Sequence, residues 1–416
     1  MKADSDVLVV GGGAVGICTA YYLTQQGIEV TVVEQGEIAS GCSEANTGLI
    51  VPSYCVPLAN PAALILGLKG ILRPGSPFYI KPRLDRDLLR WLLQFEKASK
   101  WQKMHQGIQA LHDLNYVSLE LFDRLIRSES LACGYRKDGW LKIYKKDKEF
   151  QKSIEETRLL NSYGIESRIL SVHEALEMEP VLSPEIKGGI FFPEDGHLNP
   201  VKFVVGLAEC LQNIGVNIHV QTKILNFETS NGYVTTVRTN RGDYQPKKVI
   251  LTTGAWSAEI VKRLDNVLPI QPAKGYSISI KRPVNCPSLP LYLSESKVAV
   301  TPFEDVLRFA GTLQLVGMDF SVNKRRVHSL IHAVEDCIGQ LRNLGIIKIS
   351  TGLRPCSPDG LPIIDHLPGY KNLIVATGHC MLGITLAPIT GKLISQLVCE
   401  QSPDLNISPF RISRFM

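Results

Sequence analysis

An α/β fold is predicted for this chain of 416 residues, with one domain built on a parallel sheet and interleaved with a second domain built on a mixed sheet. Three observations support it. Apolar residues make up 44% and charged residues 20%, which excludes a disordered or fibrous chain. Residues 6–34 show a strand–helix–strand pattern, and strand-like and helix-like segments then alternate along the chain without an internal repeat.

Charge and cysteine usage narrow the class of protein further. The formal net charge is +5, and its scattered distribution argues against a nucleic-acid binder. Ten cysteines without CxxC or Cys/His spacing predict free thiols in a reducing compartment and no metal site. Neither a secretory signal nor an apolar run of about 18 residues is present, so we expect a cytoplasmic protein that at most contacts the inner face of the cell membrane.

The opening elements follow from apolar spacing. Residues 6–10 form a continuous apolar run that is typical of a strand buried on both faces. Helical spacing over residues 14–26 ends at Gly27, a residue type that commonly follows the last turn of a helix. A second strand is expected at residues 29–34. This order predicts a βαβ unit at the start of the parallel sheet.

A glycine pattern lies between the first strand and the first helix. Gly11, Gly13 and Gly16 have the GxGxxG spacing of a phosphate-binding turn, in which the chain turns tightly and a pyrophosphate approaches the backbone and the helix N-terminus. Glu34 ends the second strand, where its carboxylate can accept hydrogen bonds from ribose hydroxyls. The pattern predicts a Rossmann-like domain that binds either NAD or FAD.

The segment at residues 40–48 favours FAD over NAD. It consists of small and polar residues, including Ser43, Asn46 and Gly48, and is suited to closing a loop over a pyrophosphate and a flavin. A loosely held nicotinamide needs no comparable loop.

The remaining elements alternate in type along the chain. Helices are expected at residues 84–127, at 200–215 and from Gly383 onward, and strands at 139–144, 188–193, 216–220, 234–239, 248–253 and 373–376. Residues 268–340 mix both types. We therefore expect two discontinuous domains. The FAD-binding domain comprises residues 1–60, 196–262 and 346–410. The substrate-binding domain, which carries a helical excursion, comprises residues 61–195 and 263–345.

Five further motifs follow in a fixed order along the chain. They are Ser53-Tyr54 with Pro57, Thr253-Gly254-Ala255-Trp256-Ser257, Lys274-Gly275-Tyr276-Ser277, Gly352-Leu353-Arg354-Pro355 with Pro358-Asp359-Gly360, and Thr377-Gly378-His379 with Leu382-Gly383. Together with the glycine turn they resemble the D-amino-acid-oxidase superfamily of FAD enzymes. The similarity is greatest to bacterial D-amino acid dehydrogenases of the small-subunit type, and the hydroxyproline dehydrogenase and glycine oxidase branches look similar over the same span.

The resemblance implies an activity. In such enzymes a hydride passes from the substrate Cα to flavin N5, and the resulting imine is hydrolysed, so we expect oxidative deamination of a small D-amino acid with electrons passed to a quinone or another acceptor that is not oxygen. Dehydrogenation of proline-type or hydroxyproline-type amino acids and a glycine-oxidase-like reaction remain open. An FAD-carrying subunit of a heteromeric complex without independent activity and an NAD-dependent dehydrogenase are alternatives of other classes.

The resemblance also implies a set of cofactor contacts and a non-covalent FAD. Relatives with covalent flavin carry a cysteine at a position that falls near Gly352 here, while Cys356 is expected to be a packing residue. The expected cofactor-binding residues are Gly11, Gly13, Ala14, Val15, Gly16, Glu34, Gln35, Cys42, Ser43, Asn46, Thr47, Gly48, Leu49, Ile224, Gly254, Trp256, Gly378, His379, Leu382, Gly383, Ile384 and Thr385.

Arg354 matches the arginine that holds the substrate carboxylate in the superfamily, and a planar guanidinium suits this role because it donates two parallel hydrogen bonds. The place of a second arginine in glycine-oxidase-like members is taken by Met381. Tyr54 and Tyr276 are the candidates to replace it, each as well explained as a core tyrosine, while Arg308 is expected to face the surface. His379 is expected to position the cofactor.

Residues 61–95 combine apolar runs with aromatic and basic side chains, among them Arg86 and Arg90. Such a stretch could lie on an anionic membrane and meet a quinone. Packing of a helix pair against the core explains the same pattern equally well. The resemblance to membrane-peripheral dehydrogenases favours the membrane reading.

Overall fold

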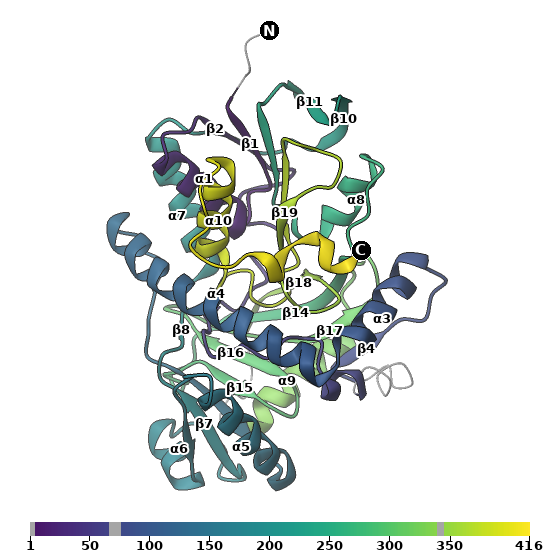
Figure 1. Cartoon of the computed structure of the whole chain (residues 1–416). Helices are drawn as coiled ribbons and strands as arrows, with labels where there is room; N and C mark the ends of the chain where they lie inside the picture. The colour runs from purple at the N-terminus through teal and green to yellow at the C-terminus, as the bar shows by residue number, and fades with distance from the viewer. Residues whose placement is uncertain (1–4, 66–75, 339–344) are drawn as a thin grey trace.

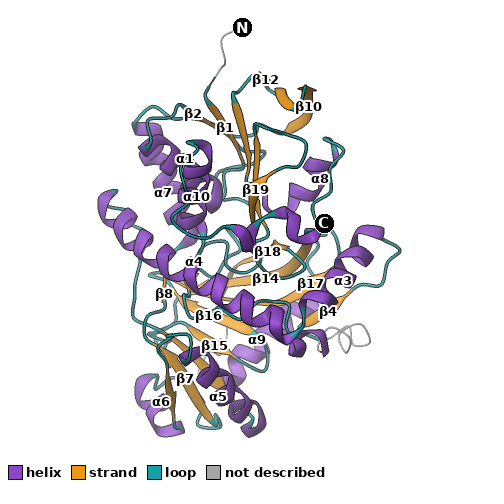
Figure 2. Ribbon diagram, in the orientation of Figure 1, coloured by secondary structure: helices purple, strands orange, loops and turns teal. Residues whose placement is uncertain are grey.

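Two large sheets form the body of the protein in a computed structural model that describes residues 5–65, 76–338 and 345–416. Figure 1 shows the six-stranded sheet at the end of the molecule that carries the N-terminus and the nine-stranded sheet below it. The long helix α4 (Trp101–Ser128) runs across both, and Figure 2 shows the other helices packed around the two sheets.

The six-stranded sheet is mainly parallel. Its order is β19 (Ile363–His366), β20 (Leu373–Thr377), β13 (Lys248–Leu251), β1 (Val7–Val10), β2 (Val30–Val33) and β9 (Asn217–His219). Only the β19–β20 pair is antiparallel. The last four residues of the predicted strand at 6–10, Val7 to Val10, are all buried, as a central parallel strand requires.

Different layers cover the two faces of this sheet. On one face lie α1 (Ala14–Gln25), α7 (Pro200–Asn213) and α10 (Ala387–Val398), which share a core with Val7, Val9 and Val32. On the other face lie the antiparallel sheet β10 (Ile224–Ser230), β11 (Tyr233–Thr239) and β12 (Gly242–Tyr244), the turn η1 (Gly254–Trp256) and α8 (Ser257–Lys262), together with η3 (Ile412–Phe415). The short turn η2 (Ser408–Phe410) precedes η3.

The nine-stranded sheet is mixed. Its order is β18 (Ile346–Cys356), β14 (Gln271–Lys281), β17 (Val306–Leu315), β16 (Val298–Pro302), β15 (Leu291–Leu293), β5 (Trp140–Tyr144), β7 (Gly188–Phe192) and β6 (Arg168–Leu170), with β4 (Phe78–Ile80) paired to β17. Its outer face packs on α6 (Val172–Met178) and α9 (Lys324–Cys337). Its inner face meets α3 (Arg86–Ala98), α4 and α5 (Asp147–Asn161). A small pair, β3 (Leu49–Ile50) with β8 (Gly196–His197), lies between the sheets.

The predicted α/β fold is confirmed by this arrangement. Two expectations of detail are wrong. α10 begins at Ala387 and not near Gly383, because Pro388 lacks an N–H and therefore fits only the first turn, and residues 382–386 form a turn that leads into it. β18, which the expected division placed with the cofactor domain, pairs with β14, so the chain passes from one sheet to the other after Cys356.

The structure also bears on the predictions about membrane contact and cysteine pairing. Within the described residues, no helix is long and apolar enough to cross a membrane. All ten cysteines are free. Of the basic stretch at residues 61–95, residues 66–75 lie outside the described part, and its remainder includes β4 and most of α3.

Candidate active site

A cavity of about 1640 Å³ lies where the two sheets meet. It is lined by the glycine turn and residues 39–49 from one side and by β14, β17 and β18 from the other. Pockets for small ligands hold roughly 300–1,000 Å³. The cavity therefore has room for a molecule of dinucleotide size together with a small substrate.

The glycine turn lines the cavity, and its backbone makes contacts so close that only glycine fits there. A Cβ on Gly11, which has a φ of +118°, would lie 2.7 Å from the carbonyl oxygen of Thr252. A Cβ on Gly16 would lie 1.8 Å from the carbonyl oxygen of Gly11. These contacts press α1 against β1 and β13, and they explain the spacing found in the sequence.

The N-terminus of α1 presents backbone N–H groups toward this part of the cavity. Its N-cap, Gly13, offers no side-chain oxygen, whereas Asp85, Asn199 and Asn323 cap α3, α7 and α9 with theirs. The Ala14 N–H donates to Ser43 Oγ over 3.2 Å. A helix N-terminus without a capping side chain, next to a hydroxyl, fits a bound pyrophosphate.

Glu34 is held at the end of β2. Its carboxylate accepts hydrogen bonds from the N–H groups of Gly12 over 2.7 Å and Gly36 over 2.8 Å. Glu34 lines the cavity together with Gln35 and Ile224, and its carboxylate can accept further hydrogen bonds. This arrangement fits a ribose beside the pyrophosphate.

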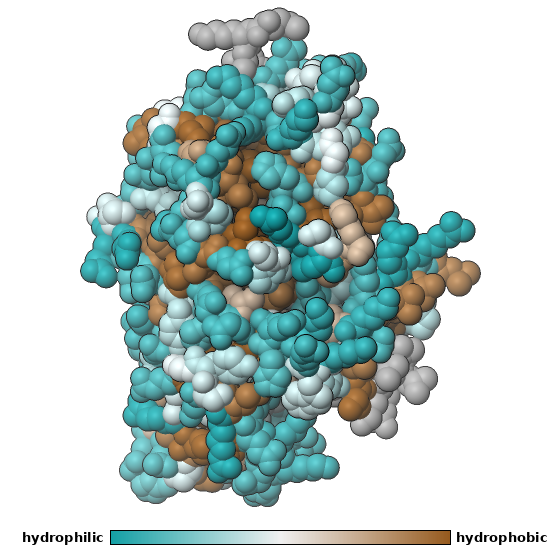
Figure 3. Space-filling model, in the orientation of Figure 1, coloured by the Kyte–Doolittle hydropathy of each residue, from teal (hydrophilic) through white to brown (hydrophobic). Residues whose placement is uncertain are grey.

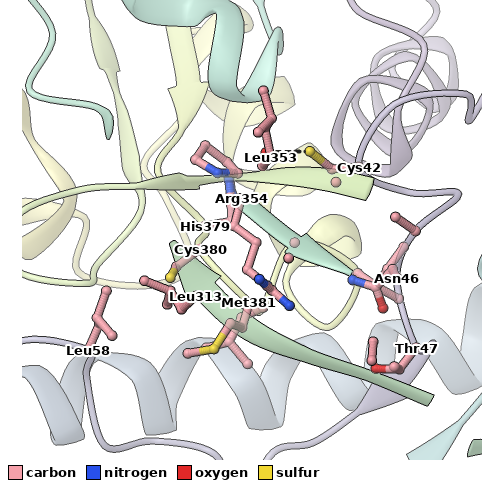
Figure 4. A pocket seen from close by; sticks show the side chains of 18 of the residues that line it. Cys42, Asn46, Thr47, Leu58, Leu313, Leu353, Arg354, His379, Cys380 and Met381 are labelled. Atoms are coloured by element: carbon pink, nitrogen blue, oxygen red, sulfur yellow. Dashed lines mark hydrogen bonds between the residues drawn. The ribbon is translucent and has the colours of Figure 1, made fainter. Parts of the chain in front are cut away.

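Residues 40–49 form the wall between the glycine turn and β18. Figure 4 shows Cys42 beside Leu353, whose carbonyl oxygen accepts its S–H, and Asn46 and Thr47 on the opposite side of Arg354. Arg308 fixes this wall, because its Nη1 donates to the carbonyl oxygens of Glu44 over 3.0 Å and Asn46 over 2.8 Å. The expectation that Arg308 faces the surface is therefore wrong.

Arg354 occupies the substrate side of the cavity. Its guanidinium lies over Gly275, where an added Cβ would meet Nη1 at 2.2 Å, and Nη1 donates to the Thr312 carbonyl oxygen over 2.9 Å. Figure 4 shows the side chain pointing into the cavity toward Met381. Among the described residues the guanidinium has no carboxylate partner. Its remaining N–H groups are available to an anionic ligand.

The structure separates the two tyrosine candidates. Tyr54 lines the cavity within electrostatic range of Arg354, and its hydroxyl contacts Met381 Sδ at 3.9 Å. In β14, Gly275 faces Arg354, whereas Tyr276 lies on the opposite face with Lys274 and packs in the core that includes α9. Tyr276 is thus not brought together with Arg354.

His379 is a buried residue in the wall of the cavity. Its Nε2 is hydrogen-bonded to Thr390 Oγ1 at 3.0 Å, and burial lowers the pKa of its imidazole to about 4. The imidazole is therefore neutral at pH 7 and links the segment before α10 to the helix itself. Leu382, Gly383 and Ile384 of this segment line the cavity.

Two thiols meet next to Arg354. Cys356 Sγ lies 2.9 Å from Cys380 Sγ, and the Cys380 N–H donates to the carbonyl oxygen of Pro355. Cys380 lines the cavity, and Figure 4 shows it beside Arg354, while Cys356 is fully buried. Cys356 packs under Trp91, whose indole N–H donates to its carbonyl oxygen.

Most of the predicted site residues line the cavity, and four do not. Gly16 and Gly48 make close backbone contacts, Gly378 has a φ of +81°, and Thr385 Oγ1 donates to the Leu49 carbonyl oxygen. These four support the wall from behind. Those that line it are Gly11, Gly13, Ala14, Val15, Glu34, Gln35, Cys42, Ser43, Asn46, Thr47, Leu49, Tyr54, Ile224, Gly254, Trp256, Tyr276, Arg354, His379, Leu382, Gly383 and Ile384.

A cluster of cavity residues on β5 and β15 was not predicted from the sequence. Trp140, Lys142 and Tyr292 line the cavity beyond Tyr54. A signal was present, because Trp140, Lys142 and Tyr144 alternate along one strand and so share one face. A lysine on the buried face of a strand, between two aromatic residues, is unusual unless it has a partner or a ligand.

Comparisons with known proteins agree with this geometry. The profile of the DAO family, described as FAD dependent oxidoreductase, matches residues 6–397. The D-amino acid dehydrogenase of Vibrio atlanticus (strain LGP32) is 29% identical over 99% of this chain and 100% of that protein, and the one of Vibrio vulnificus (strain CMCP6) is 30% identical over 95% and 96%.

Solved structures share the fold over the whole chain. The L-proline dehydrogenase from P. horikoshii has a TM-score of 0.80 at 19% identity and covers 100% of this chain and 98% of its own. The glycine oxidase from Geobacillus kaustophilus has a TM-score of 0.78 at 23% identity, with 99% of both chains covered. The glycine turn, the two sheets and the full-length sequence match all lead to one conclusion: the chain belongs to the DAO family of FAD-dependent oxidoreductases.

Proposed function

We propose that this protein is a D-amino acid dehydrogenase that oxidises the Cα–N bond of its substrate to an imine, which water then hydrolyses to the 2-oxo acid. The observation that carries the proposal is the guanidinium of Arg354, which points into the cavity without a carboxylate partner in the described chain, next to the segments that fit a dinucleotide. The names of the full-length relatives support a D-amino acid as the substrate.

The flavin supplies the hydride acceptor when it is bound. Arg354 binds the substrate carboxylate through two parallel hydrogen bonds and so fixes the orientation of Cα. The absence of a side chain on Gly275 lets the guanidinium lie flat against β14. Leu313 and Met381 provide apolar walls around it that exclude water. His379, neutral and bonded to Thr390, takes no proton from the substrate and holds the segment before α10.

Anaerobic mixing of the purified holoprotein with single amino acids tests the proposed reaction. We expect D-alanine to bleach the flavin absorbance and L-alanine to leave it unchanged. Faster bleaching by L-proline or glycine would replace the proposal with the cyclic-amino-acid or glycine-oxidase-like reaction. If dithionite bleaches the flavin but no amino acid does, the chain is an FAD-carrying subunit that needs a partner.

We infer further that FAD is bound without a covalent link. A Cβ at Gly352, near the position of the attachment cysteine in covalent relatives, would come within 2.8 Å of the Ala45 Cβ, so a larger residue does not fit there. Acid precipitation should release all yellow colour into the supernatant. Colour that stays in the pellet would contradict this inference.

The proposed electron acceptor is a membrane quinone. α3 packs Leu88, Trp91 and Phe95 against the core and exposes Leu89 and Leu93 on its outer side. Figure 3 shows hydrophilic and apolar side chains next to each other at this edge of the molecule. Basic residues border the two leucines, namely Arg86, Arg90 and Lys97. An exposed apolar strip with basic neighbours is complementary to an anionic bilayer surface.

Two measurements test the acceptor. Dithionite-reduced protein should be reoxidised faster by a soluble quinone analogue than by oxygen at equal concentration. Sedimentation with anionic vesicles should decrease with salt, because surface charges are screened, and should decrease again in a Leu89→Ser/Leu93→Ser variant. Faster reoxidation by oxygen would make the protein an oxidase and leave α3 as a core-packing helix with a wet face.

A further inference from the structure

The cluster of Trp140, Lys142 and Tyr292 forms a second end of the cavity, which residues of α5 also line. Lys142 extends from β5, and its Nζ lies 4.6 Å from the ring centroid of Phe192, 4.9 Å from that of Trp140 and 5.9 Å from that of Tyr54. These rings give the ammonium favourable cation–π contacts. They leave it without a hydrogen-bond acceptor.

Within residues 5–65, 76–338 and 345–416, no counter-ion contacts this ammonium. In the described parts of the chain its Nζ forms neither an ion pair nor a hydrogen bond, although Glu156 and Asp195 act on it through space. Glu156 is exposed to water on α5. Asp195 is fully buried and accepts hydrogen bonds from the N–H and the hydroxyl of Ser53. A charge removed from water without a partner is costly, and burial lowers the pKa of Lys142 accordingly.

A second unsatisfied donor lies beside Lys142. Trp140 is 1% exposed, and its indole N–H has no acceptor among the described residues. An indole N–H can only donate. The cluster therefore combines an unpaired cation with an unpaired donor at one end of a cavity.

Tyr54 and Tyr292 connect this end to Arg354. Both tyrosines lie within electrostatic range of Arg354, while Tyr54 contacts Lys142 and the ring of Tyr292 lies 5.5 Å from that of Trp140. The cavity thus has a cation at each end of an aromatic wall. A ligand with two anionic groups is complementary to this arrangement.

We propose that Lys142 binds the side-chain carboxylate of a dicarboxylic amino acid whose α-carboxylate is held by Arg354. The inference rests on the proposed oxidation of amino acids and adds the substrate class. It also explains why Met381 can stand at the place of a second arginine. Lys142 lies on β5, away from Arg354, so it binds a second carboxylate of the substrate and does not contribute to binding the α-carboxylate.

Flavin reduction by matched amino acids tests this assignment in the holoprotein. We expect D-glutamate to be a better substrate than D-glutamine, and Lys142→Met to lower kcat/KM for D-glutamate by about ten- to hundredfold. The same substitution should change kcat/KM for D-glutamine by less than about threefold. Lys152→Met, which removes an exposed charge from α5 at the mouth of the cavity, is the matched control and should change neither.

Binding without turnover gives an independent readout. Calorimetric titration of the oxidised holoprotein should show that Lys142→Met weakens binding of glutarate and not of pentanoate, and that Lys142→Arg retains glutarate binding. Lys142→Met should unfold at the same temperature as the parent protein or higher, because it removes a half-buried charge that has no ion-pair partner in the described chain.

Three outcomes would overturn the assignment. An equal loss for D-glutamate and D-glutamine would place Lys142 on the α-carboxylate, and no loss for either would remove Lys142 from the site. If Lys142→Met binds glutarate as tightly as the parent protein does, Lys142 is likewise not part of the site. If glutarate binding depends on Lys142 but no D-amino acid bleaches the flavin, the proposed D-amino acid reaction fails while the dicarboxylate site stands.

Discussion

The two ends of the cavity are built in different ways. The cofactor end consists mainly of backbone from two short stretches, the turn at residues 11–16 and the wall at residues 40–49, and its specificity comes from the absence of side chains. The substrate end consists of side chains from β5, β15 and β18, which lie far apart in the sequence. The first kind of site is sensitive to any added atom, and the second to single changes of charge. The following predictions test this difference.

The largest effect is expected at Arg354. Arg354→Lys should reduce kcat/KM for the amino acid substrate by about thirtyfold to several thousandfold, since loss of a charge-assisted pair in a dry site costs roughly 2–5 kcal/mol. Steady-state kinetics and the flavin-to-protein ratio measure the two ends separately, and flavin content should not change. Arg282→Lys, which affects an arginine bonded to the Phe303 carbonyl oxygen, is the matched control. Normal kinetics in Arg354→Lys would remove Arg354 from the site.

Gly16→Ala should damage the cofactor end. The new Cβ would lie 1.8 Å from the Gly11 carbonyl oxygen, and neither backbone can move away freely, so we expect a loss of roughly 1–3 kcal/mol of stability and of most bound FAD. Gly206→Ala in α7 is the control, because its nearest neighbour would be Leu131 Cδ2 at 3.5 Å. Chemical denaturation and flavin absorbance measure both effects. Full flavin content in Gly16→Ala would contradict the importance of this contact.

A pH titration of stability distinguishes the ends by the sign of its slope. Burial raises the pKa of Asp195, on the substrate side, to about 7, so the folded state holds a proton that the unfolded state releases above a pH of about 4. Asp195 therefore lowers stability as pH rises from about 4 to about 7. Asp195→Asn should therefore become more stable than the parent protein across this pH window. From the pKa difference, the linkage relation gives a gain in the free energy of unfolding of a few kcal/mol, on the order of 1.4 kcal/mol per pKa unit. A parallel pair of stability curves would show that Asp195 does not titrate in this range.

The smallest effect is expected at His379. Its pKa of about 4 in the folded state lies below the value of about 6.5 in the unfolded state, so this group costs stability as pH falls from about 6.5 to about 4. His379→Leu should lose about 1 kcal/mol at pH 7 with the hydrogen bond to Thr390 and should be less sensitive to acid than the parent. The pH profile of kcat between about pH 7 and 9 should not change. A shifted kcat profile would give His379 a role in proton transfer.

Sequence reasoning reached the cofactor end more fully than the substrate end, for a physical reason. The glycine turn is a local pattern whose strand, helix and acid follow each other in one stretch, and the structure places the turn and Glu34 along the cavity. Tyr276 and Arg308 depend instead on strand register, because a shift of one residue moves a side chain to the other face of a sheet. The register pairs Ala273 of β14 with Arg354, so the guanidinium reaches Gly275, the next residue on the same face, whereas Tyr276 lies on the other face.

Other parts of the site could not be read from any single stretch. The Thr312 carbonyl oxygen meets Arg354 only because β17 lies next to β14, and the Thr252 carbonyl oxygen meets Gly11 only because β13 lies next to β1. The position of Lys142 could have been predicted from the alternation of side chains along β5. Its significance depends on the absence of a counter-ion, which is a property of the folded molecule.

The order of the strands has a consequence for how the protein is made. β1 and α1 leave the ribosome before β13, β20 and α10, which complete the same sheet and its helix layer and lie some 240 to 380 residues later in the chain. Until then α1 can pack on β1, β2 and α7, but the side that meets α10 lacks this partner. A chain that stops before Ala387 is therefore released with this side of α1 uncovered, which favours aggregation.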